Sequence, residues 1–160
     1  MATLPQIIEE DIRLLDGLLR DFLGQTDATV ALLIDKAGFL ITHQGQAGEV
    51  DLTTLGALAS GAFMASQTIA GLVSQKDFSY TCQQGETSSL FTVNVDEHCL
   101  LVVVFPATVG LGVVKYYSAA LVKRMALQLA VARQRDPAGG LDLSEINLAD
   151  PQEFFRKKAV

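Results

Sequence analysis

Residues that usually build catalytic and metal sites are scarce in this chain. It has two histidines, His43 and His98, and two cysteines, Cys82 and Cys99. None of the four falls in a metal-ligand or nucleophile pattern. We therefore predict no metal site, and we expect the cysteines to be buried thiols, not a disulfide or a metal pair.

Signatures of nucleotide binding and acid–base chemistry are also missing. The chain has no GxxxxGK[ST] motif, and the G-x-G formed by Gly110 and Gly112 has Lys115 where a dinucleotide fingerprint needs its third glycine. Asp96 and Glu97 are adjacent carboxylates, but they lie in a turn-like stretch, where acidic residues are common for backbone reasons. We expect neither an active site nor a cofactor.

Positive charge is in short supply, with 12 Lys and Arg against 18 Asp and Glu and a net charge of −6. Nucleic acids and anionic membranes require a basic face, so neither is an expected partner. The basic residues between 115 and 135 are spaced like the solvated side of a helix. The N-terminal residues do not resemble a secretory signal, and no apolar run reaches the roughly 18 residues of a membrane-spanning helix. We expect a cytoplasmic protein.

A length of 160 residues with 49% hydrophobic content predicts one domain with a substantial core. The composition changes after residue 135, so we assign residues 1–135 to the domain and residues 136–160 to a flexible C-terminal tail. Phe154 and Phe155 lie beside three basic residues in this tail. They form either a docking segment or a disordered end.

The apolar pattern predicts an α+β domain. Helices are expected before Gly24 and from about residue 114 to residue 132, because apolar residues recur there three and four positions apart. Five strands are predicted at residues 30–34, 39–44, 78–84, 89–95 and 99–105. The continuously apolar strand 99–105 should be central in an antiparallel sheet, and the alternating strand 78–84 should be an edge.

The stretch 51–75 is predicted to be a long central helix with Asp51 as its cap. One face carries a three-and-four repeat of Leu52, Leu55, Ala59, Ala62, Ser66, Ile69 and Val73 and should pack on the core. The other side is also uncharged, since no Lys, Arg, Asp or Glu occurs between Asp51 and Lys76. We expect this side to contact a partner, and a helix buried inside a monomer is the alternative.

Three stretches resemble the roadblock/dynein light-chain family, and within it the bacterial MglB-type polarity and gliding regulators. They are ALLIDKAGFLITHQG, DLTTLGALASGAFMASQTIAGLVSQ and HCLLVVVFPATVGLGVVKYYSAAL. The resemblance covers about residues 7–135. It implies a roadblock-like, profilin-like α-β-β-α-β-β-β-α sandwich, with the central helix on one face of a five-stranded antiparallel sheet and the terminal helices on the other.

The resemblance also implies a homodimer. In this family the two central helices lie antiparallel, and the strand after each helix joins its twin to continue the sheet. Transferred to this chain, the implied dimer interface comprises Gly56, Gly61, Phe63, Phe78, Tyr80 and Cys82.

MglB-type proteins bind a Ras-like small GTPase, MglA-like, on the paired central helices and promote GTP hydrolysis without inserting an arginine finger. The implied GTPase-binding residues are Thr53, Ala57, Ser60, Met64, Gln67 and Thr68. The predicted function is a homodimeric regulator of such a GTPase in bacterial cell polarity or motility, either activating hydrolysis or assisting nucleotide exchange. Ser60→Arg is then expected to leave the fold intact and to abolish GTPase binding.

Two other functions remain open from the sequence. A non-catalytic roadblock-type scaffold or adaptor would use the same dimer without altering any rate, and a GTP turnover assay would separate it from a regulator. A small-ligand sensor would need a cavity, which the small residues of the central helix disfavour.

Overall fold

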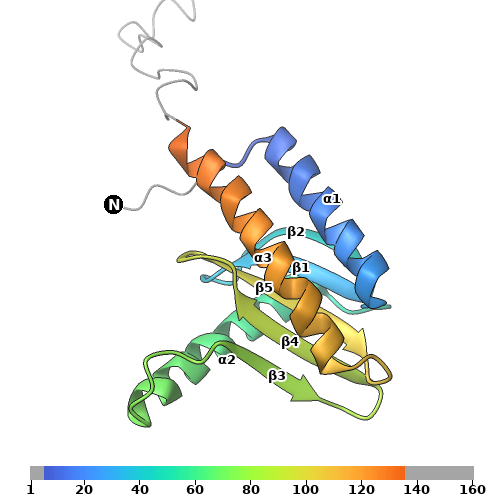
Figure 1. The fold of residues 1–160 in the computed structure, drawn as a ribbon, viewed down its shortest axis with the longest axis vertical. Helices are drawn as coiled ribbons and strands as arrows, with labels where there is room; N and C mark the ends of the chain where they lie inside the picture. Colours follow the sequence, from blue (N-terminus) through green and yellow to red (C-terminus); the bar gives the residue numbers. More distant parts are fainter. Residues whose placement is uncertain (1–5, 136–160) are drawn as a thin grey trace, which may run out of the picture.

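A computed structural model describes residues 6–135 of the chain. The described part has three helices and five strands, ordered α1 (Glu9–Thr26), β1 (Val30–Asp35), β2 (Leu40–Gly45), α2 (Leu52–Leu72), β3 (Tyr80–Gln84), β4 (Ser88–Asn94), β5 (Cys99–Pro106) and α3 (Leu111–Gln134) (Figure 1). This is the predicted element order. The tail assigned to residues 136–160 lies outside the described residues.

All five strands form one antiparallel sheet in the order β2-β1-β5-β4-β3. The continuously apolar strand β5 lies at the centre and β3 lies at an edge, as predicted. The reason is burial: every residue from Cys99 to Val103 is buried, whereas β3 is half-exposed or exposed along its length.

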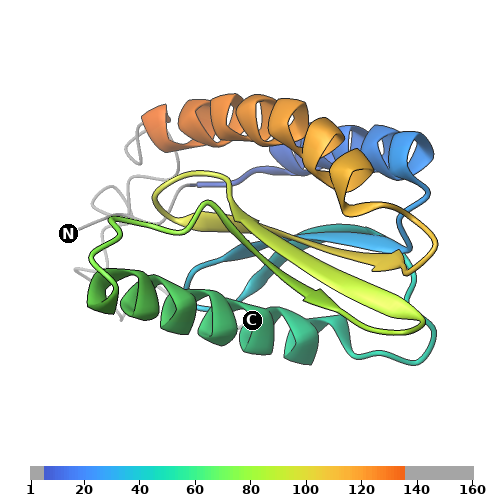
Figure 2. The same ribbon diagram turned by 60° about the horizontal axis from the view of Figure 1, so that its bottom comes forward.

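Helices cover both faces of this sheet. Figure 2 shows α2 on one side and the pair α1 and α3 on the other. Alternate side chains of β5 supply both cores, since Leu101 packs with Leu15 of α1 while Leu100 packs with Phe63 of α2. The predicted α+β sandwich is confirmed.

The turn between β1 and β2 lies against α2. Gly38 has a φ of +98°, and a methyl group there would lie 3.0 Å from the Cα of Ala57. Only glycine meets both requirements without strain. This contact fixes the distance between the first hairpin and the N-terminal half of α2. Asp51 caps that end as predicted, accepting a hydrogen bond of 3.1 Å from the Thr53 N–H.

Asp11 connects the first and last helices, which the sequence analysis did not anticipate. Its carboxylate accepts hydrogen bonds from the Ile8 N–H at 2.9 Å, from Gln128 Nε2 at 2.7 Å and from Arg135 Nη2 at 2.8 Å. Its side chain is buried, although an acidic residue in a first turn usually faces water. The hydrogen bonds from Arg135, helped by those from Ile8 and Gln128, outweigh burial and lower the pKa of Asp11 from 3.8 to about 2.

Replacing Asp11 by Asn should destabilise the fold in a pH-dependent way. Because its pKa is depressed in the folded state, its ionised carboxylate stabilises the protein above about pH 4, by about 2 kcal/mol, and this contribution disappears between about pH 4 and pH 2. Urea denaturation of the two proteins at a series of pH values measures it. A stability difference that does not shrink as the pH falls through this window would contradict the assignment.

Candidate functional site

Three side chains hold the inner face of α2 against the domain. Phe63 is fully buried on the sheet. Ser60 Oγ donates a hydrogen bond of 2.7 Å to the Lys36 carbonyl, beside the first hairpin. Gln67 makes two hydrogen bonds of 3.0 Å with the main chain of Phe78, one to its carbonyl and one from its N–H. The rotation of α2 about its axis is therefore fixed.

The opposite side of α2 is exposed and carries no charge. Leu58, Ile69 and Leu72 are 69%, 51% and 81% exposed. We call this side the outer face and define it by Thr53, Thr54, Ala57, Leu58, Gly61, Ala62, Met64, Ala65, Thr68, Ile69 and Leu72, all exposed. A contiguous apolar surface of this kind on a small domain is typical of an interaction site.

One line of residues along α2 has the spacing of a helix-packing seam. Leu55, Leu58, Ala62, Ala65, Ile69 and Leu72 follow one another at intervals of three, four, three, four and three residues. We call this line the α2 seam. Large side chains lie at its ends and alanines at its middle, which permits close approach of another helix at the centre. The seam was not predicted from the sequence, because three of its residues, Leu55, Ala62 and Ile69, were expected to face the core.

Four of the six residues predicted to bind a GTPase lie together on the outer face. Thr53, Ala57, Met64 and Thr68 are exposed along one flank of α2, beside the seam; we call them the α2 flank.

Ser60 and Gln67 do not join the α2 flank. Ser60 is buried and Gln67 is half-buried, because both are occupied in holding α2 to the domain. The predicted register was displaced: the core face is centred on Phe63, and Ala62 and Ile69, which were assigned to the core, are exposed.

The predicted dimer residues also divide. Gly56 and Phe63 lie inside the domain; a methyl group at Gly56 would approach Ile34 Cγ2 to 3.1 Å, and Phe63 packs on the sheet. They are therefore unavailable to a partner. Gly61 lies on the outer face with open space around it.

The other three predicted dimer residues lie at or beside the β3 edge of the sheet. Tyr80 and Cys82 are on β3 and Phe78 precedes it, and all three are half-exposed. The ring of Tyr80 stacks near Phe91, with centroids 5.4 Å apart, and Lys115 Nζ lies 4.5 Å from the Tyr80 centroid. Among residues 6–135, β3 pairs with β4 alone, so no described strand covers its other edge.

Both cysteines are free thiols; Cys99 is buried as expected, whereas Cys82, also expected to be buried, is half-exposed. Burial raises the pKa of Cys99 to about 12, which keeps that thiol unreactive at neutral pH.

The expectation about membrane-spanning segments needs correction. Among the described residues α2 is long and apolar enough, by length and composition alone, to cross a membrane. The sequence has no unbroken apolar run of this length, and α2 reaches the required mean hydropathy with Thr, Ser and Gly interspersed. Its inner face packs on the sheet through Phe63, as the core helix of a domain does.

Comparison with known proteins identifies the class. The family model for the Roadblock/LC7 domain matches residues 14–105, more than half of the chain. The chain therefore belongs to the Roadblock/LC7 family. No curated protein matches.

Within this family the chain is similar to MglB proteins of known structure. A structure described as MglB with tetrameric arrangement has 30% identity and a TM-score of 0.75, covering 79% of this chain and 95% of that one. The gliding protein MglB from Thermus thermophilus has 31% identity and a TM-score of 0.72, covering 79% and 96%. Myxococcus xanthus MglB has 25% identity and a TM-score of 0.74, covering 81% and 97%.

The observed register reverses the expectation for Ser60→Arg. An arginine at this buried position removes the hydrogen bond to Lys36 and places a charge against the sheet, so we expect a loss of more than about 3 kcal/mol in the free energy of unfolding. The matched control is Thr68→Arg on the outer face, expected to change it by less than about 0.5 kcal/mol. Urea denaturation measures both, and equal stabilities would contradict the register.

Proposed function

We propose that this protein is a homodimeric regulator of a Ras-like small GTPase. The observation that carries the proposal is the uncharged, exposed outer face of α2 in a chain that belongs to the Roadblock/LC7 family. Similarity to MglB proteins at 25–31% identity supports the regulatory role, and the tetrameric arrangement described for one of them supports self-association.

The proposed dimer joins the α2 seams of two subunits. A two-fold axis between Phe63 and Met64 brings Leu58 of one subunit opposite Ile69 of the other, and Ala62 opposite Ala65. The apolar pattern reads the same in both directions about this point, as an isologous contact between antiparallel helices requires. The proposed dimer also uses the outer edge of β3, where pairing with its twin would extend the sheet.

The proposed GTPase surface is the α2 flank of Thr53, Ala57, Met64 and Thr68. None of these side chains is basic, so none could enter a GTPase active site as an arginine finger. Regulation would proceed by ordering the GTPase's own catalytic groups or by assisting nucleotide exchange. We place this function in the cytoplasm, in cell polarity or gliding motility, on the basis of the MglB likeness.

Two substitutions at neighbouring positions distinguish the role of the α2 seam from that of the α2 flank. Ala65→Arg puts a charge in the seam, so the dissociation constant of the dimer should rise at least ten-fold. Met64→Arg adds the same charge on the flank, and this protein should remain dimeric. Sedimentation equilibrium measures both proteins. Unchanged association of the Ala65→Arg protein would show that the seam is not the dimer interface.

Stimulated GTP hydrolysis is the direct test of the regulatory role. We expect the Ras-like GTPase encoded nearest this gene to hydrolyse GTP faster with a molar excess of this protein, and the Met64→Arg dimer to lose at least ten-fold of that stimulation. Single-turnover hydrolysis measures the rate, and exchange of a fluorescent nucleotide tests the exchange-factor form. A stable complex that changes neither rate would favour the adaptor function; the absence of any complex would contradict GTPase binding.

A further inference from the structure

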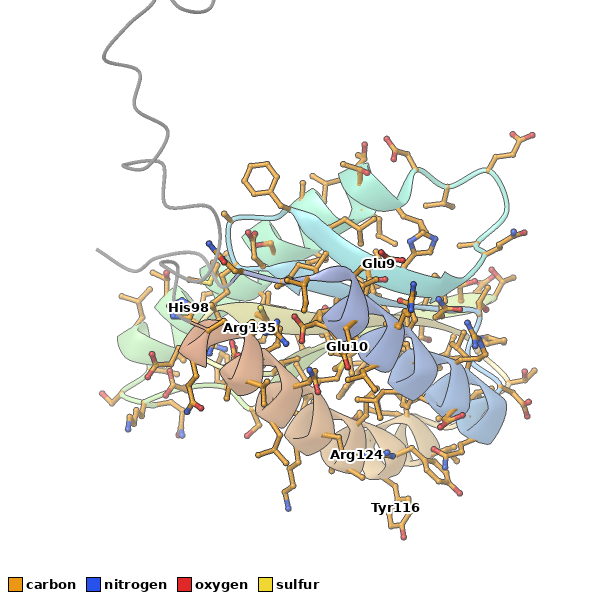
Figure 3. All side chains as sticks on the ribbon, turned by 90° about the horizontal axis from the view of Figure 1, so that it is seen from above. Glu9, Glu10, His98, Tyr116, Arg124 and Arg135 are labelled. Atoms are coloured by element: carbon orange, nitrogen blue, oxygen red, sulfur yellow. The ribbon has the colours of Figure 1, made fainter. Side chains whose placement is uncertain are left out.

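A second surface lies on the other side of the sheet, between α1 and α3. A groove of about 860 Å³ opens there between the C-terminal half of α1 and the N-terminal half of α3. Leu18 and Phe22 of α1 line one side, and Tyr116, Tyr117 and Leu121 of α3 line the other. We call it the helix groove. In Figure 3, Tyr116 and Arg135 lie toward opposite ends of α3, and Arg124 lies between them.

The rim of the helix groove is basic, although the chain as a whole is acidic. The chain has a net charge of −6, yet α3 contains four basic residues and no acidic one. Arg133 pairs with Asp96 and Lys115 lies over Tyr80, but Lys123 and Arg124 line the helix groove.

Few acidic residues lie beside the basic residues of this rim. Arg20 adds a third cation to the lining, and Asp21 is its one acidic residue among those described. The ion pairs found in residues 6–135 are Arg13–Glu9, Arg133–Asp96 and Arg135–Asp11, so Lys123 and Arg124 have no described carboxylate partner. An acidic occupant fits this rim.

Exposed apolar side chains continue from the helix groove toward the end of α3. Tyr116, Ala120, Leu127 and Val131 follow at helical spacings and are exposed. Leu14, on α1, is also half-exposed to solvent at 50%. The surface therefore combines an apolar line with a basic rim, which suits an apolar segment that carries acidic residues.

We propose that residues 141–150 of the same chain occupy the helix groove. Four residues of this segment, Leu141, Leu143, Ile146 and Leu148, have large apolar side chains. Three others, Asp142, Glu145 and Asp150, are acidic, and none is basic. The segment supplies apolar side chains that match the apolar lining and negative charges that match the basic rim.

The point where the chain leaves α3 makes this docking geometrically possible. Arg135 is held by Asp11 beside the start of α1. Arg124 lies eleven residues back along α3, about 17 Å at 1.5 Å per residue. The six steps from Arg135 to Leu141 can span about 20 Å when extended. Gly139 and Gly140 in this connection permit the reversal of direction.

Docking within the chain does not depend on the proposed GTPase function. The short connection gives the segment a high effective concentration at the groove, so contacts that would be weak between separate molecules suffice. A partner that captures the segment would at the same time open the groove.

Backbone amide chemical shifts of the full-length protein test this docking. In one variant Leu141, Leu143, Ile146 and Leu148 are all replaced by Ser. We expect amides lining the helix groove, among them Tyr116 and Ala120, to differ between wild type and this variant, while those of the α2 outer face do not. A synthetic peptide of residues 139–151, added to the variant, should move the groove amides toward their wild-type shifts.

Charge reversal supplies the matched control. Arg124→Glu should displace the segment, so the amides of residues 141–150 should shift, and added salt should act in the same direction. Arg13→Glu makes the same charge change at an exposed residue whose described ion pair is with Glu9 of the same helix, and should leave those amides unmoved. Identical groove shifts in wild type and the four-serine variant, or shifts that appear only after a GTPase is added, would overturn the proposal.

Discussion

The structure depends on how α2 is seated on the sheet. Phe63 fills one position against β1 and β5, and Ser60 and Gln67 form hydrogen bonds to main-chain groups on either side of it. A rotation of the helix by one residue would empty the Phe63 position and leave both polar side chains without partners, and both changes are costly in a close-packed interior. This seating decides which side chains of α2 turn outward.

The outward side chains form an apolar surface that the described part of one chain leaves exposed. Burying a leucine or isoleucine completely is worth about 1.5 to 3 kcal/mol, and Leu58, Ile69 and Leu72 remain largely exposed in the single chain. Two copies joined at the seam would bury six such side chains, a gain of the size needed to offset the entropy lost on association. In the proposed dimer the α2 flank stays outside that contact, which would leave it open to the proposed GTPase.

Much of the fold is predictable from the sequence. The apolar run of β5 and the alternation of β3 placed these strands correctly, because a central strand is covered on both faces and an edge strand is not. The register of α2 was not predictable in the same way. Both sides of this helix are apolar and uncharged, so two different three-and-four repeats compete, and only the bulk of Phe63 and the partners of Ser60 and Gln67 distinguish them.

The buried position of Asp11 was not predictable for a related reason: an acidic residue in a first helical turn usually faces solvent, and its partner Arg135 is more than a hundred positions away in the sequence.

The two proposed surfaces lie on opposite sides of the sheet, which limits how they could influence each other. The helix groove is bounded by α1 and α3, whereas the outer face belongs to α2, with the strands between them (Figure 2). A segment docked in the groove therefore leaves the α2 flank uncovered. The docked segment would not block the α2 flank. If the tail affects a partner bound at α2, the partner and the helix groove must therefore compete for the tail. Asp11 holds Arg135 through an ion pair that persists well below neutral pH. The point at which the tail leaves α3 is therefore the same whether or not the segment is docked.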